Sequence, residues 1–328
     1  MDKKVKNIFK LLGGILAVIA LGVIILVVVL TITEFKPDDV EKISVVAAGS
    51  EVQDVDMDDA DTLENGGRLN VKELSDGDSV RVMTWNTGYA ALGENADFFM
   101  DGGKSVSSSD KETVQENLEA ISEQIEESDP DIVFMQEVDV DSKRSHYINE
   151  LDAITGNLTG YSSSFAENYK TLYVPYPLPT IGKVDCGLAT LSKYEVSDCK
   201  RISLPCPFGY PMRLCNLKRC LMVSRVPIEG SDKELVLVNL DHSKAIIIIL
   251  VYDCLYTCRF TCTAVSEKKY IVCFLSFDKC LRIVNQLFLD LFPERGQRHS
   301  SARHLLTSFN LYFSCGILNK KSKGGFLC

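Results

Sequence analysis

Two short apolar segments, about fifty positions apart, have the pattern of β-strands. In the first, Val80, Val82 and Thr84 alternate with Arg81, Met83 and Trp85, and this period of two predicts a strand. The second is the apolar run 132–138. Between them an amphipathic helix is predicted from apolar residues at intervals of four, three and four, namely Val114, Leu118, Ile121 and Ile125. Ser109 and Glu112 have capping-box spacing at its start, and Pro130 ends it.

Later apolar runs predict further strands at 187–192, 220–226 and 235–240. The order strand, helix, strand, then mostly strands is typical of a layered α/β domain whose central sheet is packed on both faces.

The N-terminal pattern is different, because 11–30 contains twenty residues without a charge or a proline. A helix of that length spans about 30 Å, the thickness of a bilayer core. The preceding residues 1–10 are basic and acids follow Thr33, so the positive-inside rule predicts a cytoplasmic N-terminus. We therefore expect a single-pass anchor at 11–32 in the plasma membrane, with the main domain outside. A cleaved signal peptide is the alternative, although its apolar region is usually nearer 7–15 residues.

Residues 33–78 are rich in acids and small polar residues and poor in large apolar ones. Such a segment buries too little surface to order itself, apart from limited pairing at 43–48. We interpret it as an acidic spacer before a domain that begins near residue 79.

The first two predicted strands each end in an oxygen-bearing side chain, Asn86 and Glu137. Amide and carboxylate oxygens are hard ligands of the kind that Mg²⁺ prefers. Each residue has a simpler interpretation. Asn86 can open the turn Asn-Thr-Gly, and Glu137 can be a surface residue at a strand end, together with Gln136 and Asp139. In a regular strand, Glu137 shares a face with Val133 and Met135, and burial there requires a partner cation.

The segments Arg81–Asn86 and Asp131–Glu137 resemble the opening of the endonuclease/exonuclease/phosphatase family, the DNase I-like phosphodiesterases, and more particularly a bacterial membrane-anchored branch. The resemblance covers about residues 79–240. It continues through Asn168-Tyr169-Lys170 and 173–177, which resemble a substrate-side loop, and then through 187–194, 202–206, 213–220 and 234–240. It implies a DNase I-like four-layered α/β sandwich, incomplete in this chain and preceded by one transmembrane helix.

The resemblance also implies Mg²⁺-dependent (or Mn²⁺-dependent) hydrolysis of a phosphodiester. Glu137 is then the metal ligand, and Asn86 positions the phosphate or the water shell of the ion. Lys170, Arg213 and Arg219 are candidate contacts to the substrate phosphate. The substrate is a phospholipid headgroup or nucleic acid, although the net charge of −10 argues against nonspecific nucleic-acid binding by the complete domain. The lipid bilayer is the other expected partner, through 11–32.

Two features of the family are not found. The family has His two residues after the Asn that corresponds to Asn239, where this chain has Asp241, and His242 comes one place late. A slip of one residue turns a side chain to the opposite face of a strand, so His242 is a doubtful catalytic residue. A Gly-Asp-x-Asn segment is also absent from the sequence.

The composition changes from about residue 241. Residues 242–328 carry twelve Lys and Arg against five acids, and they contain seven of the twelve cysteines. The simplest interpretation is a frameshift, insertion or rearrangement near position 241 that replaced the C-terminal half of the domain. Two functions remain open on the sequence: a membrane-anchored phosphodiesterase, or a catalytically inactive remnant of one with exposed sheet edges.

Overall fold

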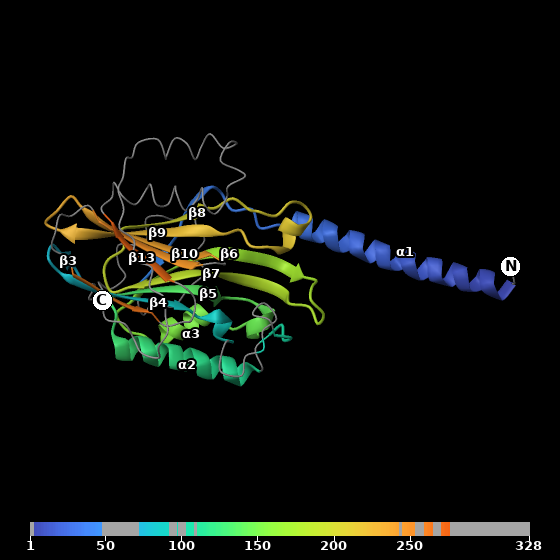
Figure 1. Cartoon of the computed structure of the whole chain (residues 1–328), viewed down its shortest axis with the longest axis horizontal. Coiled ribbons are helices and arrows are strands. Elements are labelled where there is room, and N and C mark those ends of the chain that lie inside the picture. Colours follow the sequence, from blue (N-terminus) through green and yellow to red (C-terminus); the bar gives the residue numbers. More distant parts are fainter. Residues whose placement is uncertain are drawn as a thin grey trace.

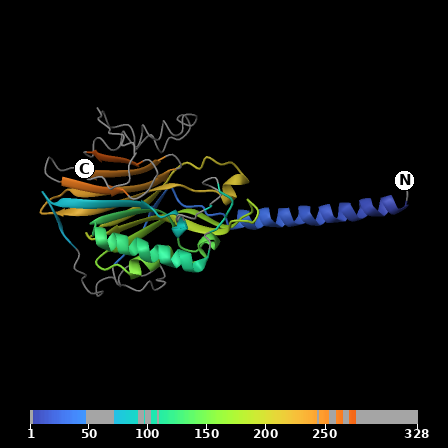
Figure 2. The same cartoon turned by 60° about the horizontal axis from the view of Figure 1, so that its bottom comes forward.

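The computed structural model describes residues 3–47, 72–91, 97, 103–107 and 110–242, and the backbone of three further strands at 245–252, 259–264 and 270–275. A long helix, α1 (Lys3–Ile32), projects from a body built of two β-sheets (Figures 1 and 2). The segment 4–32 has a mean hydropathy of 3.4 in its most apolar window, so α1 is long and apolar enough to cross a membrane.

The body consists of one six-stranded and one seven-stranded sheet. The six-stranded sheet has the order β12 (Arg259–Ala264), β4 (Ser79–Asn86), β5 (Ile132–Asp139), β7 (Gly182–Ser192), β6 (Ser162–Val174) and β2 (Val45–Val46). The other sheet has the order β1 (Val40–Lys42), β8 (Asp198–Ser203), β9 (Cys220–Glu229), β10 (Glu234–His242), β11 (Ala245–Tyr252) and β13 (Tyr270–Leu275), and β3 (Leu74–Ser75) pairs with β9.

The two sheets pack face to face, and helices cover the outer face of the six-stranded sheet (Figure 1). The core between the sheets is formed by apolar residues of β4, β5, β9 and β10, including Val82, Phe134, Val226 and Leu237. The helices are α2 (Lys111–Ser128) and α3 (Glu150–Gly156). The mixed α/β, two-sheet architecture predicted from the sequence is therefore confirmed. No helix covers the outer face of the seven-stranded sheet within the part of the chain that the structure describes.

The amphipathic stripe predicted for 114–125 is the buried face of α2. The helix begins at Asp110, whose side chain accepts a hydrogen bond from the Thr113 amide at 2.7 Å, and Glu112 lies in the first turn. Ser109, the predicted cap, lies outside the described residues.

Two segments are more regular than the sequence predicts. The residues 168–174, which resemble a substrate-side loop, lie within the thirteen-residue strand β6, and only 175–177 lie beyond it. Both ends of the acidic segment 33–78 contribute short strands: β1 pairs with β8 and β3 with β9, while β2, which pairs with β6, lies within 43–48, where limited pairing is expected. Its middle, 48–71, lies outside the described residues.

Backbone from the compositionally distinct tail extends both sheets. β11 pairs antiparallel with β10, β13 pairs parallel with β11, and β12 pairs parallel with β4. The rest of 243–328 lies outside the described residues.

Candidate functional site

The parallel strands β4 and β5 end at the same edge of the six-stranded sheet. Asn86 is paired in register with Gln136, so the two side chains lie on the same face. Thr87 joins the two strand ends, because its hydroxyl donates to the carbonyls of Gln136 and Glu137 at 3.1 and 3.0 Å. Its amide also donates to the Gln136 carbonyl. The structure thus brings together the two segments that the sequence singled out.

Asn86 has a structural role at this edge. Its side-chain oxygen accepts a hydrogen bond from the Gly88 amide at 3.0 Å, and this contact closes the turn that follows β4. Its side-chain nitrogen is buried and has no hydrogen-bond partner. The turn predicted as the simpler interpretation of Asn86 is present, and it leaves one polar atom of the amide available.

Glu137 lies on a β-bulge. The register between β5 and β7 shifts between Met135 and Val138, and Glu137 has a φ of 58°. A bulge breaks the alternation of side chains along a strand. Glu137 is therefore half-buried while Gln136 and Val138 on either side are fully buried. The expectation that Glu137 shares a face with Val133 and Met135 is wrong for this reason.

A buried amide from the opposite sheet closes the bulge. Asn239 on β10 donates through its side-chain nitrogen to the carbonyls of Met135 at 3.1 Å and Ala189 at 2.9 Å. Its side-chain oxygen accepts from the side-chain nitrogen of Gln136 at 2.8 Å. The hydrogen bonds that β5 and β7 lose at the bulge are replaced by contacts to β10, so Asn239 positions Glu137 indirectly.

Three polar atoms near this contact are buried without hydrogen-bond partners: Thr84 Oγ1, Asn86 Nδ2 and Gln136 Oε1. Such atoms cost free energy when they are left unpaired, so their concentration at one strand edge is typical of a functional site. Among the residues with described side chains, no three His, Cys, Asp or Glu residues gather in a metal cluster. A Mg²⁺ ion that keeps most of its waters needs only one or two carboxylates, and the half-buried Glu137 is a carboxylate at this end of β5 that would supply one.

A buried ion pair involves Asp139, which ends β5 two residues after Glu137. Arg144 donates two hydrogen bonds to the carboxylate of Asp139, at 2.9 and 2.8 Å, and its guanidinium stacks on the ring of Tyr89 at 3.3 Å. The Asp139 amide donates to the carboxylate of Glu150, and burial, together with the charge of Asp139, raises the pKa of Glu150. Asp139 and Gln136 are both fully buried, so the surface interpretation of these two residues is wrong.

The candidate phosphate contacts are distributed over several elements. Lys170 on β6 is 3.1 Å from the Asp185 carboxylate and also pairs with Glu167, so its charge is already balanced. Arg213, in the turn before β9, binds Glu34 beside the end of α1 at 3.1 Å. Arg219 is half-buried, and its Nε has no hydrogen-bond partner. His242 is the last residue of β10, and its side chain lies outside the described part of the structure.

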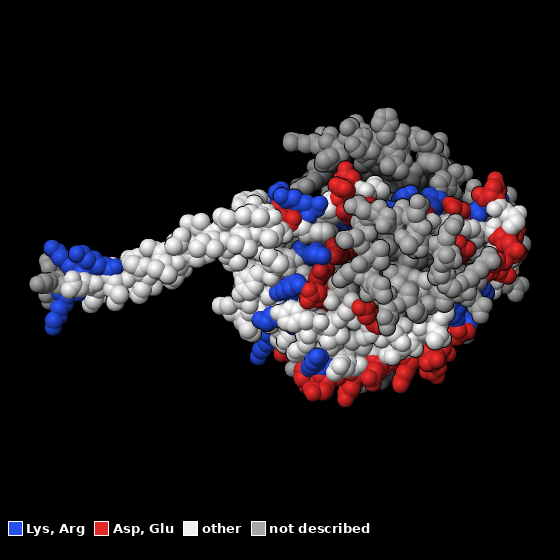
Figure 3. Space-filling model, turned by 180° about the vertical axis from the view of Figure 1, so that it is seen from behind, with Lys and Arg blue, Asp and Glu red and all other residues white. Residues whose placement is uncertain are grey.

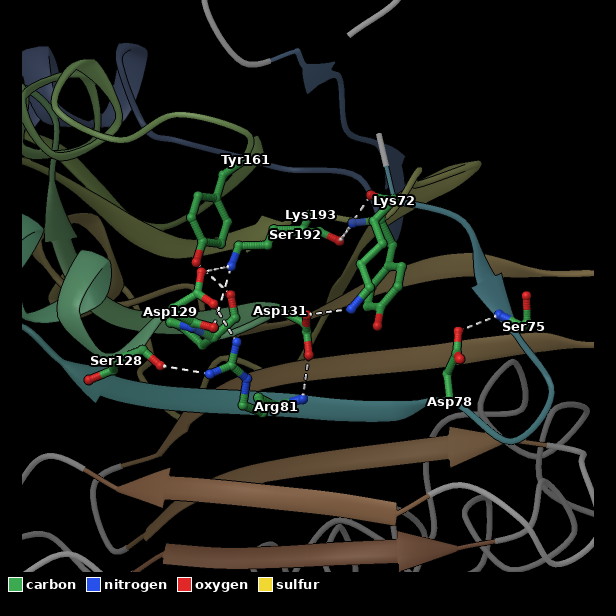
Figure 4. Close-up of polar contacts among 12 residues, drawn as sticks. Lys72, Ser75, Asp78, Arg81, Ser128, Asp129, Asp131, Tyr161, Ser192 and Lys193 are labelled. Carbon is green, nitrogen blue, oxygen red and sulfur yellow. Dashed lines mark hydrogen bonds and ion pairs between the residues drawn. The ribbon is translucent and has the colours of Figure 1, made fainter. Parts of the chain in front are cut away.

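A second polar cluster lies at the opposite edge of the same sheet, where β4 and β5 begin (Figure 4). Asp131 accepts hydrogen bonds from the Arg81 amide and from Lys72, at 2.7 and 2.9 Å. Asp129 pairs with both Arg81 and Lys193. Acids and bases here satisfy one another, so this cluster joins β4, α2, β5 and β7 and is a structural feature.

Sequence reasoning did not identify Asn239, Gln136 or Thr87 as parts of the site. Asn239 and Gln136 are separated by 103 positions, and only the packing of the two sheets brings them together. The clearest sequence signal is an Asn in the middle of an otherwise apolar strand, because burial of an unpaired amide is costly.

A helix-covered sheet packed on a second sheet, with an amide and a carboxylate at the ends of two parallel strands, defines a class of layered α/β proteins. The family model for the endonuclease/exonuclease/phosphatase family matches residues 83–268, more than half of the chain, so this protein belongs to that family. The matched range includes the first part of the compositionally distinct tail.

Solved structures show weaker similarity. An endonuclease/exonuclease/phosphatase from Beutenbergia cavernae DSM 12333 is 20% identical over 53% of this chain and 37% of its own, with a TM-score of 0.31. TDP2 from C. elegans is 16% identical over 52% of this chain and 34% of its own, with a TM-score of 0.25. ANGEL2, a 2',3'-cyclic phosphatase, is 15% identical over 42% of this chain and 30% of its own, with a TM-score of 0.21. The chain spans about a third of the length of these structures, and no curated protein matches it significantly.

Proposed function

We propose that this protein is a membrane-anchored, Mg²⁺-dependent phosphodiester hydrolase whose site is the edge formed by Asn86 and Glu137. The observation that carries the proposal is the bulge at Glu137, which removes one carboxylate from the regular alternation of a buried strand, near the strand ends where Asn86 and Gln136 have unpaired amide atoms. A strained residue of this kind is typical of functional sites. Membership of the endonuclease/exonuclease/phosphatase family supports the reaction class.

In this proposal Glu137 holds the ion, and Gln136 contributes its unpaired oxygen. The ion, when bound, neutralises charge on the phosphate and its leaving oxygen. Asn86 donates from its unpaired side-chain nitrogen to a phosphate oxygen, and the half-buried Arg219 is a further candidate donor. The Asp139–Arg144 pair keeps the segment after Glu137 rigid and acts as a positioning pair.

The test is hydrolysis of a soluble phosphodiester, bis(4-nitrophenyl) phosphate, by the full chain in detergent. We expect turnover that requires Mg²⁺ or Mn²⁺ and disappears on chelation. Glu137→Ala should abolish it, whereas Glu127→Ala, at an exposed carboxylate on α2, should leave it unchanged. Turnover that persists in Glu137→Ala would contradict the site assignment.

An inactive remnant is the second candidate, favoured by Asp241 at the place where the family has its His. It predicts no turnover by the unmodified chain at any metal concentration, with aggregation caused by unpaired sheet edges. Cooperative unfolding of a soluble, monodisperse chain counts against it.

For the anchor, we propose that α1 crosses the plasma membrane once, with residues 1–10 in the cytoplasm and the two-sheet body outside. The support is the length and hydropathy of α1 and the four lysines that precede its apolar part. An epitope tag placed before Met1 should resist protease added to intact cells, while the body is digested. Digestion of the tag would mean that the N-terminus lies outside the cell, contrary to the proposed orientation.

A further inference from the structure

The end of the body next to α1 exposes large apolar side chains on two loops. In the β6–β7 loop, Tyr176 and Leu178 are 74% and 83% exposed, and in the β8–β9 loop Tyr210 and Met212 are 57% and 64% exposed. We call these four residues the apical surface. Isolated apolar residues on a surface are common, but here four of the most exposed ones in the described body occupy two loops at one end.

The anchor helix reaches these loops without a linker. Leu30 is only 5% exposed because the body covers it, and α1 contacts β6 and the turn at Met212–Cys215. The hydroxyl groups of Thr31 and Tyr210 lie 3.3 Å apart. The end of the apolar helix lies against the β8–β9 loop (Figure 1), and with α1 as the proposed anchor this loop would lie at the depth where α1 leaves the bilayer.

The junction between α1 and the body is held by charge. Glu34 is bound by Arg213 at 3.1 Å and Lys218 at 3.0 Å, and Lys36 lies 3.6 Å away. Its carboxylate is almost completely buried, so the junction is a fixed contact. A hollow of about 580 Å³ lies there, lined by these charged groups and by Phe35 and Phe208.

Lys and Arg side chains lie along the end of the body next to α1, with Asp and Glu side chains among them (Figure 3). In the junction itself, three cations surround one carboxylate, which leaves an excess of positive charge. Lys143 adds to this end, since it donates to the carbonyl of Thr180 in the β6–β7 loop. Anionic headgroups attract basic residues near a membrane, and tyrosine is favoured at the interface because its ring is apolar and its hydroxyl polar.

We propose that the apical surface is a membrane-contact surface that seats the body on a phospholipid bilayer, with Tyr176, Leu178, Tyr210 and Met212 in the interfacial layer. This inference rests on the proposed anchor but adds a second contact to it. The bilayer is favoured as the partner because α1 ends among the same loops.

The strand directions place the candidate site at the same end of the body. β7 runs antiparallel to β5, so its first residue, Gly182, lies at the edge where β4 and β5 end. β6 ends beside that residue, since Val174 pairs with Gly182. The turn that contacts α1 packs on this end of β6 through a hydrogen bond from Thr171 to the Leu214 carbonyl. With the apical surface on the bilayer, the end of the sheet that carries Asn86 and Glu137 therefore faces the membrane.

The test is depth-dependent fluorescence quenching of the full chain in phosphatidylcholine vesicles that contain a brominated phosphatidylcholine. The only tryptophan, Trp85, is first replaced through Trp85→Phe. Single tryptophans are then introduced through Leu178→Trp on the apical surface, through Asp232→Trp in the β9–β10 turn at the opposite end of the body, and through Leu21→Trp within α1.

We expect strong quenching and a blue-shifted emission for Leu178→Trp, and neither for Asp232→Trp. Quenching of Leu21→Trp without quenching of Leu178→Trp would overturn the contact surface and leave the anchor standing. Absence of quenching for Leu21→Trp would contradict the anchor and the contact surface together. A second experiment tests whether the two loops insert together. A tryptophan is introduced into the β8–β9 loop through Met212→Trp, and the double substitution Tyr176→Asp and Leu178→Asp in the β6–β7 loop should then abolish its quenching.

Discussion

At the scale of single residues, the most informative position is Glu137. A residue other than glycine with a φ of 58° pays a conformational cost of roughly 1 kcal/mol or more. The cost is offset by contacts that hold the bulge on both sides, from Thr87, directly after β4, and from Asn239 on β10. The backbone conformation of the bulge thus sets the direction of the Glu137 carboxylate, and the rotamer preferences of the side chain contribute little.

This geometry predicts that two substitutions of Glu137 have the same effect on activity and different effects on stability. Glu137→Gly and Glu137→Ala both remove the carboxylate and should both abolish turnover. Because glycine adopts positive φ without strain, the Gly variant should be about 1 kcal/mol more stable than the Ala variant in urea unfolding. An Ala variant at least as stable as the Gly variant would mean that Glu137 is not held in the left-handed conformation.

Asn239 allows a test of the support behind Glu137. Asn239→Ala leaves the side-chain nitrogen of Gln136 and the carbonyls of Met135 and Ala189 without a buried partner, and should cost roughly 2–4 kcal/mol of unfolding free energy. Asn216→Ala is the matched control, because Asn216 donates one exposed hydrogen bond, to the Met212 carbonyl. Urea unfolding followed by circular dichroism compares the two, and similar losses would contradict the role assigned to Asn239.

At the scale of elements, sequence periodicity was sufficient to predict an element wherever its apolar residues keep a regular period. α2 follows its predicted stripe because its apolar residues face a single core, and β4 follows its predicted alternation between two cores, with Val80 and Val82 between the sheets and Met83 against the helices. It failed at the bulge in β5, since an inserted residue shifts the alternation and its position depends on β7 and β10. It also missed β1 and β3, which are too short to be recognised and form only against β8 and β9, whereas β2 lies within 43–48, where limited pairing is expected.

The junction between α1 and the body gives a prediction on pH. Burial alone would raise the pKa of Glu34, but the hydrogen bond from Lys218 and the charges of Lys218, Arg213 and Lys36 outweigh it and lower that pKa below its ordinary value. A lowered pKa contributes stability above the unfolded-state value of about 4.5, and that contribution is lost as pH falls through the folded-state pKa.

Glu34→Gln should therefore destabilise the protein by about 1–2 kcal/mol at pH 7. The difference from the unmodified chain should shrink below pH of about 4.5, the ordinary pKa of a glutamate. Urea unfolding at a series of pH values measures both. A difference that stays constant down to the lowest pH would show that the loss at pH 7 does not come from the charge of Glu34.

At the scale of the whole molecule, the proposed anchor α1, the apical surface and the candidate site lie at one end of the body. We expect the full chain, reconstituted into vesicles that carry a phosphodiester-labelled lipid, to hydrolyse the label on its own vesicles. Label on protein-free vesicles mixed with them should remain intact, because α1 does not exchange between bilayers. A soluble phosphodiester in the same mixture is the control, and equal hydrolysis of both vesicle populations would contradict a site turned toward its own membrane.

The direct contact of Leu30 and Thr31 with the body has a kinetic consequence. With α1 as the proposed anchor and a lipid as the proposed substrate, a body held directly against α1 would meet its substrate by lateral diffusion in a plane. Its turnover is then governed by the number of substrate molecules per unit area of membrane. Dilution of the vesicle suspension should leave the rate per protein unchanged, whereas dilution of the substrate with inert lipid within the same bilayer should lower it.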